Sequence, residues 1–166
     1  GGTSGGDVSF EAPDRADEVS IDFTEPIEEG LSAKDYHTKG KSAEDANDKS
    51  GALSYYGKAA ETDPDNFQYH FDLAMLLQDL GRNKEAASEY EECVRIKPDN
   101  FWAHNNLGLA CINSNQPERA VVVLEKALTL EPKGSMDKDK AKGIAKRNLA
   151  AAYRMTGQND KATGLE

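Results

Sequence analysis

The sequence predicts an all-α protein built from a repeated antiparallel helix pair, preceded by a disordered acidic tail. The first observation is that Pro64-Asp65-Asn66-Phe67 recurs as Pro98-Asp99-Asn100-Phe101, with a third proline at Pro132. The two intervals between these prolines are equal and define a 34-residue period, and self-similarity at such a period is typical of stacked structural repeats. The second is that small residues return at matching helical positions. The third is uneven charge, with a net of −8 over residues 1–30 and −2 over residues 31–166.

Residues 1–30 form the expected tail or tether. They hold nine acidic residues and one basic residue, a glycine-rich opening and few large apolar groups, a composition that cannot offset the entropy lost on ordering. Within this stretch, Val19-Ser20-Ile21-Asp22-Phe23 alternates apolar and polar residues, as an extended segment on a protein surface would. Both a short docking motif and an unstructured linker are open for this segment.

The repeat domain is expected at residues 31–166, and its first helix has a cap in which Ser32 precedes Asp35 by three residues. The units fall at about 33–66, 67–100, 101–134 and 143–166. Leu80-Gly81 supplies a glycine stop between helices, and Asn115-Gln116-Pro117 places a proline at the start of the next helix. Small residues that allow close helix crossings occupy equivalent positions: Gly40, Ala74 and Gly108 in the first helices, and Ala52, Ala86 and Ala120 in the second helices.

The fourth unit lies eight residues later than the 34-residue period predicts, which indicates an insertion at about 133–142. Eight residues correspond to about two helical turns. Either the first helix of this unit is longer at its start, or a flexible loop holds the additional residues.

Leu107-Gly108, Ala120, Leu124 and Pro132 carry a resemblance to a known family. The pattern resembles that of the tetratricopeptide repeat family, and the resemblance covers roughly residues 33–164. It implies a right-handed superhelical array in which the first helix of each unit lines an extended concave groove. In the family, that groove holds peptides.

The resemblance also implies which residues line the partner-binding groove. They are Phe71, Met75 and Gln78 in one unit, Trp102, Asn105, Leu109 and Ile112 in the next, and Ile144, Arg147 and Arg154 in the last. Members that bind acidic chaperone tails use lysine, asparagine and arginine at five positions, which here hold Phe71, Met75, Asn106, Ile144 and Asn148, and only Asn106 agrees. The groove centre is therefore expected to be apolar and to take an amphipathic helix or an extended segment, with Phe71 and Trp102 as aromatic anchors. Alternatively, some of these side chains pack between helices.

The sequence predicts no enzyme, no cofactor and no metal site. The phosphate-loop, zinc-protease and serine-hydrolase motifs are missing. His70 and His104 are separated by one 34-residue period, which favours a repeated packing role, and Cys93 and Cys111 occupy core positions. The net charge of −10 disfavours nucleic acid as a partner. No stretch approaches the ~20 apolar residues that a membrane span requires.

We therefore expect a non-enzymatic scaffold that binds a peptide or helix of a protein partner in its groove. The alternative is a structural or assembly protein that self-associates or joins a membrane-anchored complex. A further hypothesis makes the tail itself a partner, with Val19–Phe23 folded into the groove and its acids facing the cations of residues 133–166: Lys142, Lys146, Arg147 and Arg154. A solvated basic helix face is the alternative to that hypothesis.

The sequence leaves the compartment open between two expectations. The chain begins at Gly1, which suggests a processed or excised fragment, and a cytoplasmic location is the default. The glycine-rich acidic start is also similar to the spacer that follows the lipidated cysteine of bacterial lipoproteins, which would place the repeats in the cell envelope. The oligomeric state is not predicted.

Overall fold

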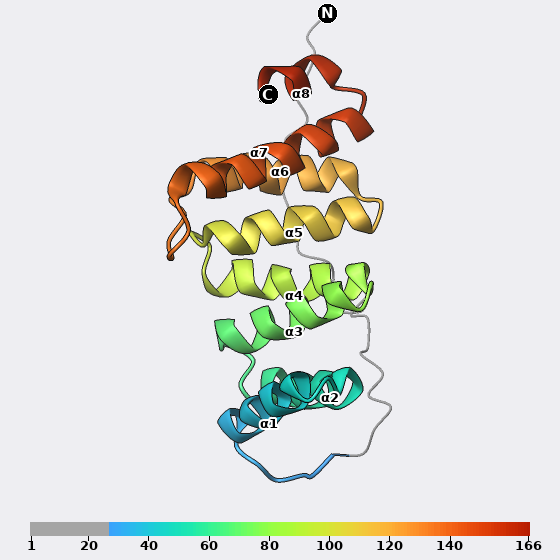
Figure 1. The fold of residues 1–166 in the computed structure, drawn as a ribbon, viewed down its shortest axis with the longest axis vertical. Coiled ribbons are helices and arrows are strands. Elements are labelled where there is room, and N and C mark those ends of the chain that lie inside the picture. The colour runs from blue at the N-terminus through green and yellow to red at the C-terminus, as the bar shows by residue number, and fades with distance from the viewer. Residues whose placement is uncertain (1–26) are drawn as a thin grey trace, which may run out of the picture.

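The computed structural model describes residues 27–166, which contain eight helices and no strand. The helices follow one another along the long axis of a single stack (Figure 1), so the predicted all-α array of helix pairs is confirmed. The segment Val19–Phe23 lies outside the described residues. The helices are α1 (Ala33–Asp45), α2 (Lys49–Thr62), α3 (Phe67–Asp79), α4 (Asn83–Ile96), α5 (Phe101–Asn113), α6 (Pro117–Leu128), α7 (Lys138–Met155) and α8 (Asn159–Gly164).

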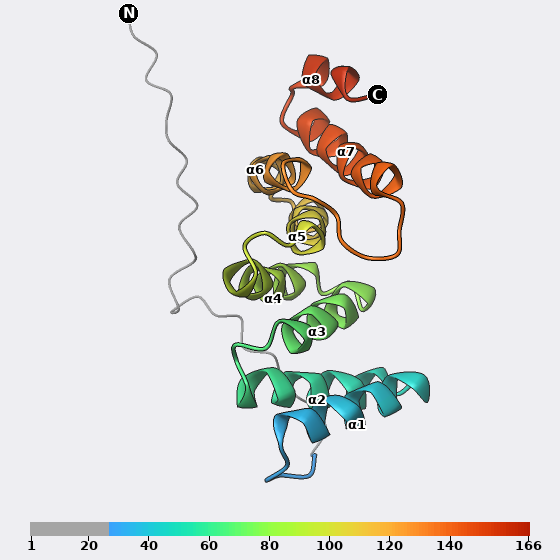
Figure 2. The same cartoon turned by 90° about the vertical axis from the view of Figure 1, so that its left-hand side faces the viewer.

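The order of the helices in the stack follows their order in the chain. Each helix contacts the next one, and α5 also contacts α7. Figure 2 shows α4 and α6 on one side of the stack and α3, α5 and α7 on the other. The first helices of successive units therefore share one side, which we call the first-helix face.

The recurring Pro-Asp-Asn-Phe motif forms the turn that starts a first helix. The side chain of Asn66 accepts a hydrogen bond from the backbone N–H of Tyr69 (3.3 Å), and Asn100 accepts one from Ala103 (2.9 Å). These caps satisfy N–H groups that the first turn of a helix leaves without partners. The repeated sequence is therefore a repeated helix start.

Two buried histidines each contact the Pro-Asp-Asn-Phe turn of their own unit. Nε2 of His70 lies 2.7 Å from the carbonyl oxygen of Pro64, and Nε2 of His104 lies 2.8 Å from that of Pro98. Both histidines are buried. The 34-residue interval between them therefore reflects a packing role, in agreement with the sequence analysis.

A residue in the left-handed conformation follows every first helix. These residues are Asn47, Gly81, Asn115 and Gly157, with φ values of 58°, 75°, 60° and 78°. Glycine and asparagine adopt this conformation at the lowest cost. In each unit the left-handed residue lies seven positions after the small residue at the helix crossing: Gly40, Ala74, Gly108 and Ala150.

The small crossing residues make room for large side chains from the second helices. A Cβ atom added to Gly40 would lie 2.5 Å from Cδ1 of Tyr56, and one added to Gly108 would lie 2.3 Å from Cγ of Leu124. Both large side chains are buried. The close approach of the helices at these two points therefore requires glycine.

The longest helix is α7, with 18 residues. It begins at Lys138, inside the segment that the sequence marks as an insertion, and its cap lies thirteen residues before the crossing residue Ala150 instead of eight. The start of the helix is therefore five residues longer. The turn before it, residues 129–137, is also longer than the four-residue turns before α3 and α5, so both alternatives apply in part. Its first turns bury Ala141 and Ala145 against Phe101 and Ala127 in a separate small cluster. This contact fixes the added turns on the end of α5 and α6.

Candidate functional site

The structure places the predicted groove residues on three helices, α3, α5 and α7. Their exposure differs. Met75 is half-exposed, Arg147 and Arg154 are exposed, and Asn105 is buried. The remaining members are partly buried: Phe71, Gln78, Trp102, Leu109, Ile112 and Ile144.

The apolar part of the first-helix face centres on α3. The ring of Phe71 meets the ring of Tyr90 edge-on at 5.7 Å and stacks on Phe67 at 5.4 Å. Met75 lies one turn further along α3 and has 50% of its surface exposed. Phe71 is therefore held by neighbouring rings, whereas Met75 offers a flexible apolar side chain to solvent.

Trp102 is partly buried and has a structural role. Its ring meets that of Phe101 edge-on at 5.0 Å, and it packs against the small cluster that Ala141 and Ala145 join. A substitution here would disturb the contact between α5 and α7. Trp102 is thus a poorer test of partner binding than Met75.

A row of asparagines connects α5 to α7. Nδ2 of Asn105 donates to Oδ1 of Asn106 (3.1 Å), and Oδ1 of Asn105 accepts from Nδ2 of Asn148 (3.1 Å). Asn105 is only 2% exposed, so its hydrogen-bonding groups point to neighbours. The more accessible members are Asn106 and Asn148, which are not among the groove residues predicted from the sequence. Their separation in the chain equals the 34-residue period plus the eight-residue insertion.

The α1 end of the first-helix face carries a partly buried polar contact. Nε2 of His37 lies 2.6 Å from Oδ2 of Asp72, and Nε2 of Gln68 donates to the other oxygen of Asp72 (2.8 Å). The imidazole of His37 lies between the rings of Tyr56 and Tyr69. These contacts tie α1 to α3.

The α7 end of the first-helix face is basic. Lys138 and Lys142 share one carboxylate, Glu131, at 3.1 and 3.9 Å. The two lysines lower the pKa of Glu131, first through the hydrogen bond from Lys138 and then through their charges. Arg154 pairs with Glu166. An open hollow of about 590 Å³ lies beside these residues and is lined by Met136, Asp139, Lys140, Gly143, Ile144 and Arg147.

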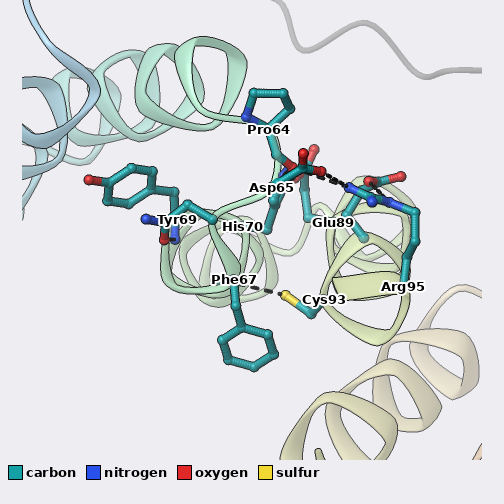
Figure 3. Close-up of polar contacts among 10 residues, drawn as sticks. Pro64, Asp65, Phe67, Tyr69, His70, Glu89, Cys93 and Arg95 are labelled. Carbon is teal, nitrogen blue, oxygen red and sulfur yellow. Dashed lines mark hydrogen bonds and ion pairs between the residues drawn. The ribbon is translucent and has the colours of Figure 1, made fainter. Parts of the chain in front are cut away.

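Figure 3 shows the polar contacts around His70. Nδ1 of His70 lies 2.6 Å from Oε2 of Glu89. Burial lowers the pKa of His70, but the hydrogen bond and charge of Glu89 outweigh this effect, so the pKa is raised overall. One 34-residue period further along the chain, Val123 stands at the position equivalent to Glu89. Nδ1 of His104 accordingly has no hydrogen-bond partner among the described residues, and burial lowers its pKa.

The two cysteines are buried and unpaired by a disulfide. Sγ of Cys93 faces the carbonyl oxygen of Phe67 at 3.8 Å (Figure 3). Burial raises the pKa of Cys93, and it raises that of Cys111 to about 11. Because the thiolate is the nucleophilic form, neither thiol is placed for covalent chemistry.

Over residues 27–166, no three histidine, cysteine or acidic side chains converge as metal ligands, and none of the helices described there has the length and hydropathy to cross a bilayer.

Solved structures with the same fold are similar to this chain. MamA (TM-score 0.71, 22% identity) matches over 80% of this chain and 68% of its own. The Sgt2 TPR domain from Aspergillus fumigatus (0.61, 23%) matches over 78% of this chain and 82% of its own. The first TPR of Spaghetti (RPAP3), bound to the HSP90 peptide SRMEEVD (0.62, 21%), matches over 76% of this chain and 94% of its own. At these identities the likeness shows the fold.

The sequence comparisons identify the family. No curated protein matches the sequence. Two models described as tetratricopeptide repeat match residues 37–101 and 79–136, so that together they run through the first three helix pairs. The helix pairs, the crossings at small residues and these two matches agree, and the chain belongs to the tetratricopeptide repeat family.

Proposed function

We propose that this protein is a non-enzymatic scaffold that binds a peptide or helix of a partner along its first-helix face. The tetratricopeptide repeat fold supports a protein-interaction scaffold. One observation carries the proposal for this face. Successive first helices leave apolar side chains partly or half exposed there: Met75, Leu109, Ile112 and Ile144. Exposed apolar surface of this kind marks interaction sites in soluble proteins.

The chemistry of the face favours a partner that is apolar at one part and acidic at another. Met75 is unbranched and polarizable, so it adapts to different apolar side chains. The cations of α7, including Arg147, would meet acidic side chains at the other end. Asn106 and Asn148 can supply amide groups between these two parts. At the other positions of the chaperone-tail pattern stand Phe71, Met75 and Ile144, so an acidic chaperone tail is not the partner that we propose.

Affinity capture with matched variants tests this proposal. The bait proteins are the wild type, Met75→Lys on the first-helix face and Val122→Lys on α6. Both replaced side chains are exposed apolar residues, 50% and 39% accessible, so the two substitutions change surface charge and polarity in the same way. We expect partners captured by the wild type to be lost by Met75→Lys and retained by Val122→Lys.

Titration of a captured partner then gives the size of the effect. Burying a methionine side chain contributes about 1.5–3 kcal/mol, so Met75→Lys should weaken binding at least about tenfold. Equal binding of all three proteins would refute the assignment of the face. Sedimentation at several concentrations tests the competing class, a structural protein that self-associates. For such a protein, Met75→Lys would lower the mass of the assembly in solution and leave the set of captured partners unchanged.

A further inference from the structure

We propose that residues 7–25 bind along the first-helix face of their own array, where an external partner must displace them. This inference rests on the proposed function, because it assigns a regulator to the same face. It draws on three features: the charge of the two surfaces, the spacing of apolar residues, and the length of chain available.

The charges of the two surfaces are opposite. Residues 7–25 hold seven acidic side chains and a single basic one, Arg15. On α7, Lys140, Lys146 and Arg147 are exposed, and within residues 27–166 no carboxylate lies at ion-pair distance from them. The nearby Glu131 is already shared by Lys138 and Lys142. An acidic segment would supply the counter-charge that α7 lacks.

The apolar residues of the segment 7–25 fall into two groups, and so do those of the first-helix face. In the segment, one group is Val8 and Phe10, and the other is the alternating stretch Val19–Phe23. On the first-helix face, one group is Phe71 with Met75 on α3. The other is Met136 with Ile144, which line the open hollow beside α7.

Chain length decides which group of the segment reaches which group of the face. The described chain starts beside α1, where Oε2 of Glu28 lies 3.6 Å from Nζ of Lys39, and α7 lies toward the other end of the stack (Figure 2). An extended chain spans at most about 3.5 Å per residue, so Val19 lies within about 28 Å of Ile27 and Val8 within about 65 Å. Three first-helix steps separate α1 from α7. Directly packed helices lie about 8–10 Å apart, and α1, α3 and α5 pack mainly through the second helices between them, so each of these steps is at least that long. The chain must also pass around α1.

The reach therefore fixes the direction of the bound segment. Val19–Phe23 can contact α1 and α3, near Phe71 and Met75, but it cannot extend to α7. The acids that can reach Lys140, Lys146 and Arg147 are the distant ones: Asp7, Glu11 and Asp14. This register replaces the pairing of Val19–Phe23 with the α7 cations that charge alone suggested.

Spin labels on the full chain test both the contact and its direction. Ser9→Cys and Ser20→Cys each place one label inside an apolar group of the segment, and the native Cys93 and Cys111 are buried, so labelling is selective. We expect a label at position 9 to cause loss of amide signal around Ile144 on α7. A label at position 20 should cause loss around Met75 on α3. Salt at 1 M, where the Debye length is about 3 Å, should restore the α7 signals.

Matched charge variants separate a specific contact from a general electrostatic effect. Lys146→Gln with Arg147→Gln should abolish the signal loss from position 9. Lys84→Gln on α4 combined with Lys126→Gln on α6 also removes two exposed cations and should leave it unchanged. Labelled protein mixed with unlabelled ¹⁵N protein reports binding between copies, and signal loss in that mixture would overturn the intramolecular assignment.

Two other results would also overturn the inference: no signal loss on the first-helix face, or the reverse pairing of labels and helices. The failure of this inference is distinguishable from failure of the proposed function. If Met75→Lys still abolishes partner capture while the labels have no effect, the face binds partners and the tail does not regulate it.

Discussion

Gly108→Ala tests whether the close crossing of α5 and α6 stabilises the stack. The added Cβ would lie 2.3, 2.6 and 2.8 Å from three carbons of Leu124, a side chain with no exposed surface. Overpacking of this severity costs about 3 kcal/mol. Replacing glycine inside a helix returns about 1 kcal/mol through helix propensity. The net loss of unfolding free energy should be about 2 kcal/mol.

Urea unfolding monitored by circular dichroism and by fluorescence of Trp102, the single tryptophan, measures this loss. Gly143→Ala is the control, because it lies in α7 and a Cβ there meets no atom within 4 Å. It should stabilise the protein by up to about 1 kcal/mol. The two alanine substitutions therefore have effects of opposite sign.

A double-mutant cycle assigns the cost to one contact. Leu124→Ala alone should cost about 2–5 kcal/mol because it leaves a cavity. In that background, Gly108→Ala fills space and should no longer destabilise, which gives a coupling energy of about 2 kcal/mol or more. Equal costs in both backgrounds, or no cost in the wild type, would refute the argument from the crossing.

Three further predictions concern titration and oxidation. The pKa of His104 is lowered, so stability falls as the pH drops below about 6.5. Val123→Glu would place a carboxylate opposite His104, so in urea unfolding the free energy of unfolding of this variant, relative to that of the wild type, should rise as the pH is lowered from 7.5 to 5.5. The pKa of His70 is raised, so its pair with Glu89 stabilises at low pH and this is lost as the pH rises through the raised pKa; Glu89→Gln should cost more at pH 6 than at pH 9. A peroxide should convert Met75 to the sulfoxide while Cys93 stays a thiol, which peptide mass spectrometry checks.

The repeat period predicts most of the fold, because helix starts, crossings and stops are local features that recur in the sequence. Asn66 and Asn100 cap helices, and glycine or asparagine ends them, through contacts made within a few residues. The sequence left two alternatives for the eight added residues, a longer helix or a loop, because their number alone does not determine how many of them fold onto α5 and α6; the structure shows a part of each.

The candidate site is less predictable, because its exposure depends on how neighbouring units pack. Asn105 occupies a groove position of the repeat, yet the amide of Asn148 on α7 covers it. His70 and His104 look equivalent in sequence, but only His70 has a carboxylate opposite, contributed by the following helix. Such differences come from contacts with residues of other helices. A repeat pattern describes what the units share and therefore does not predict these contacts.

The constant interval of seven residues between crossing and left-handed stop has a consequence for how this array tolerates change in length. In the first three units the helix cap lies eight residues before the crossing, and in the fourth it lies thirteen before it. Additional turns have entered upstream of the crossing only, where they protrude without altering the alignment of the next helix. The N-terminal ends of the first helices can therefore accept additional turns, whereas the seven residues after each crossing must keep their number. New surface is added at the N-terminal ends of these helices.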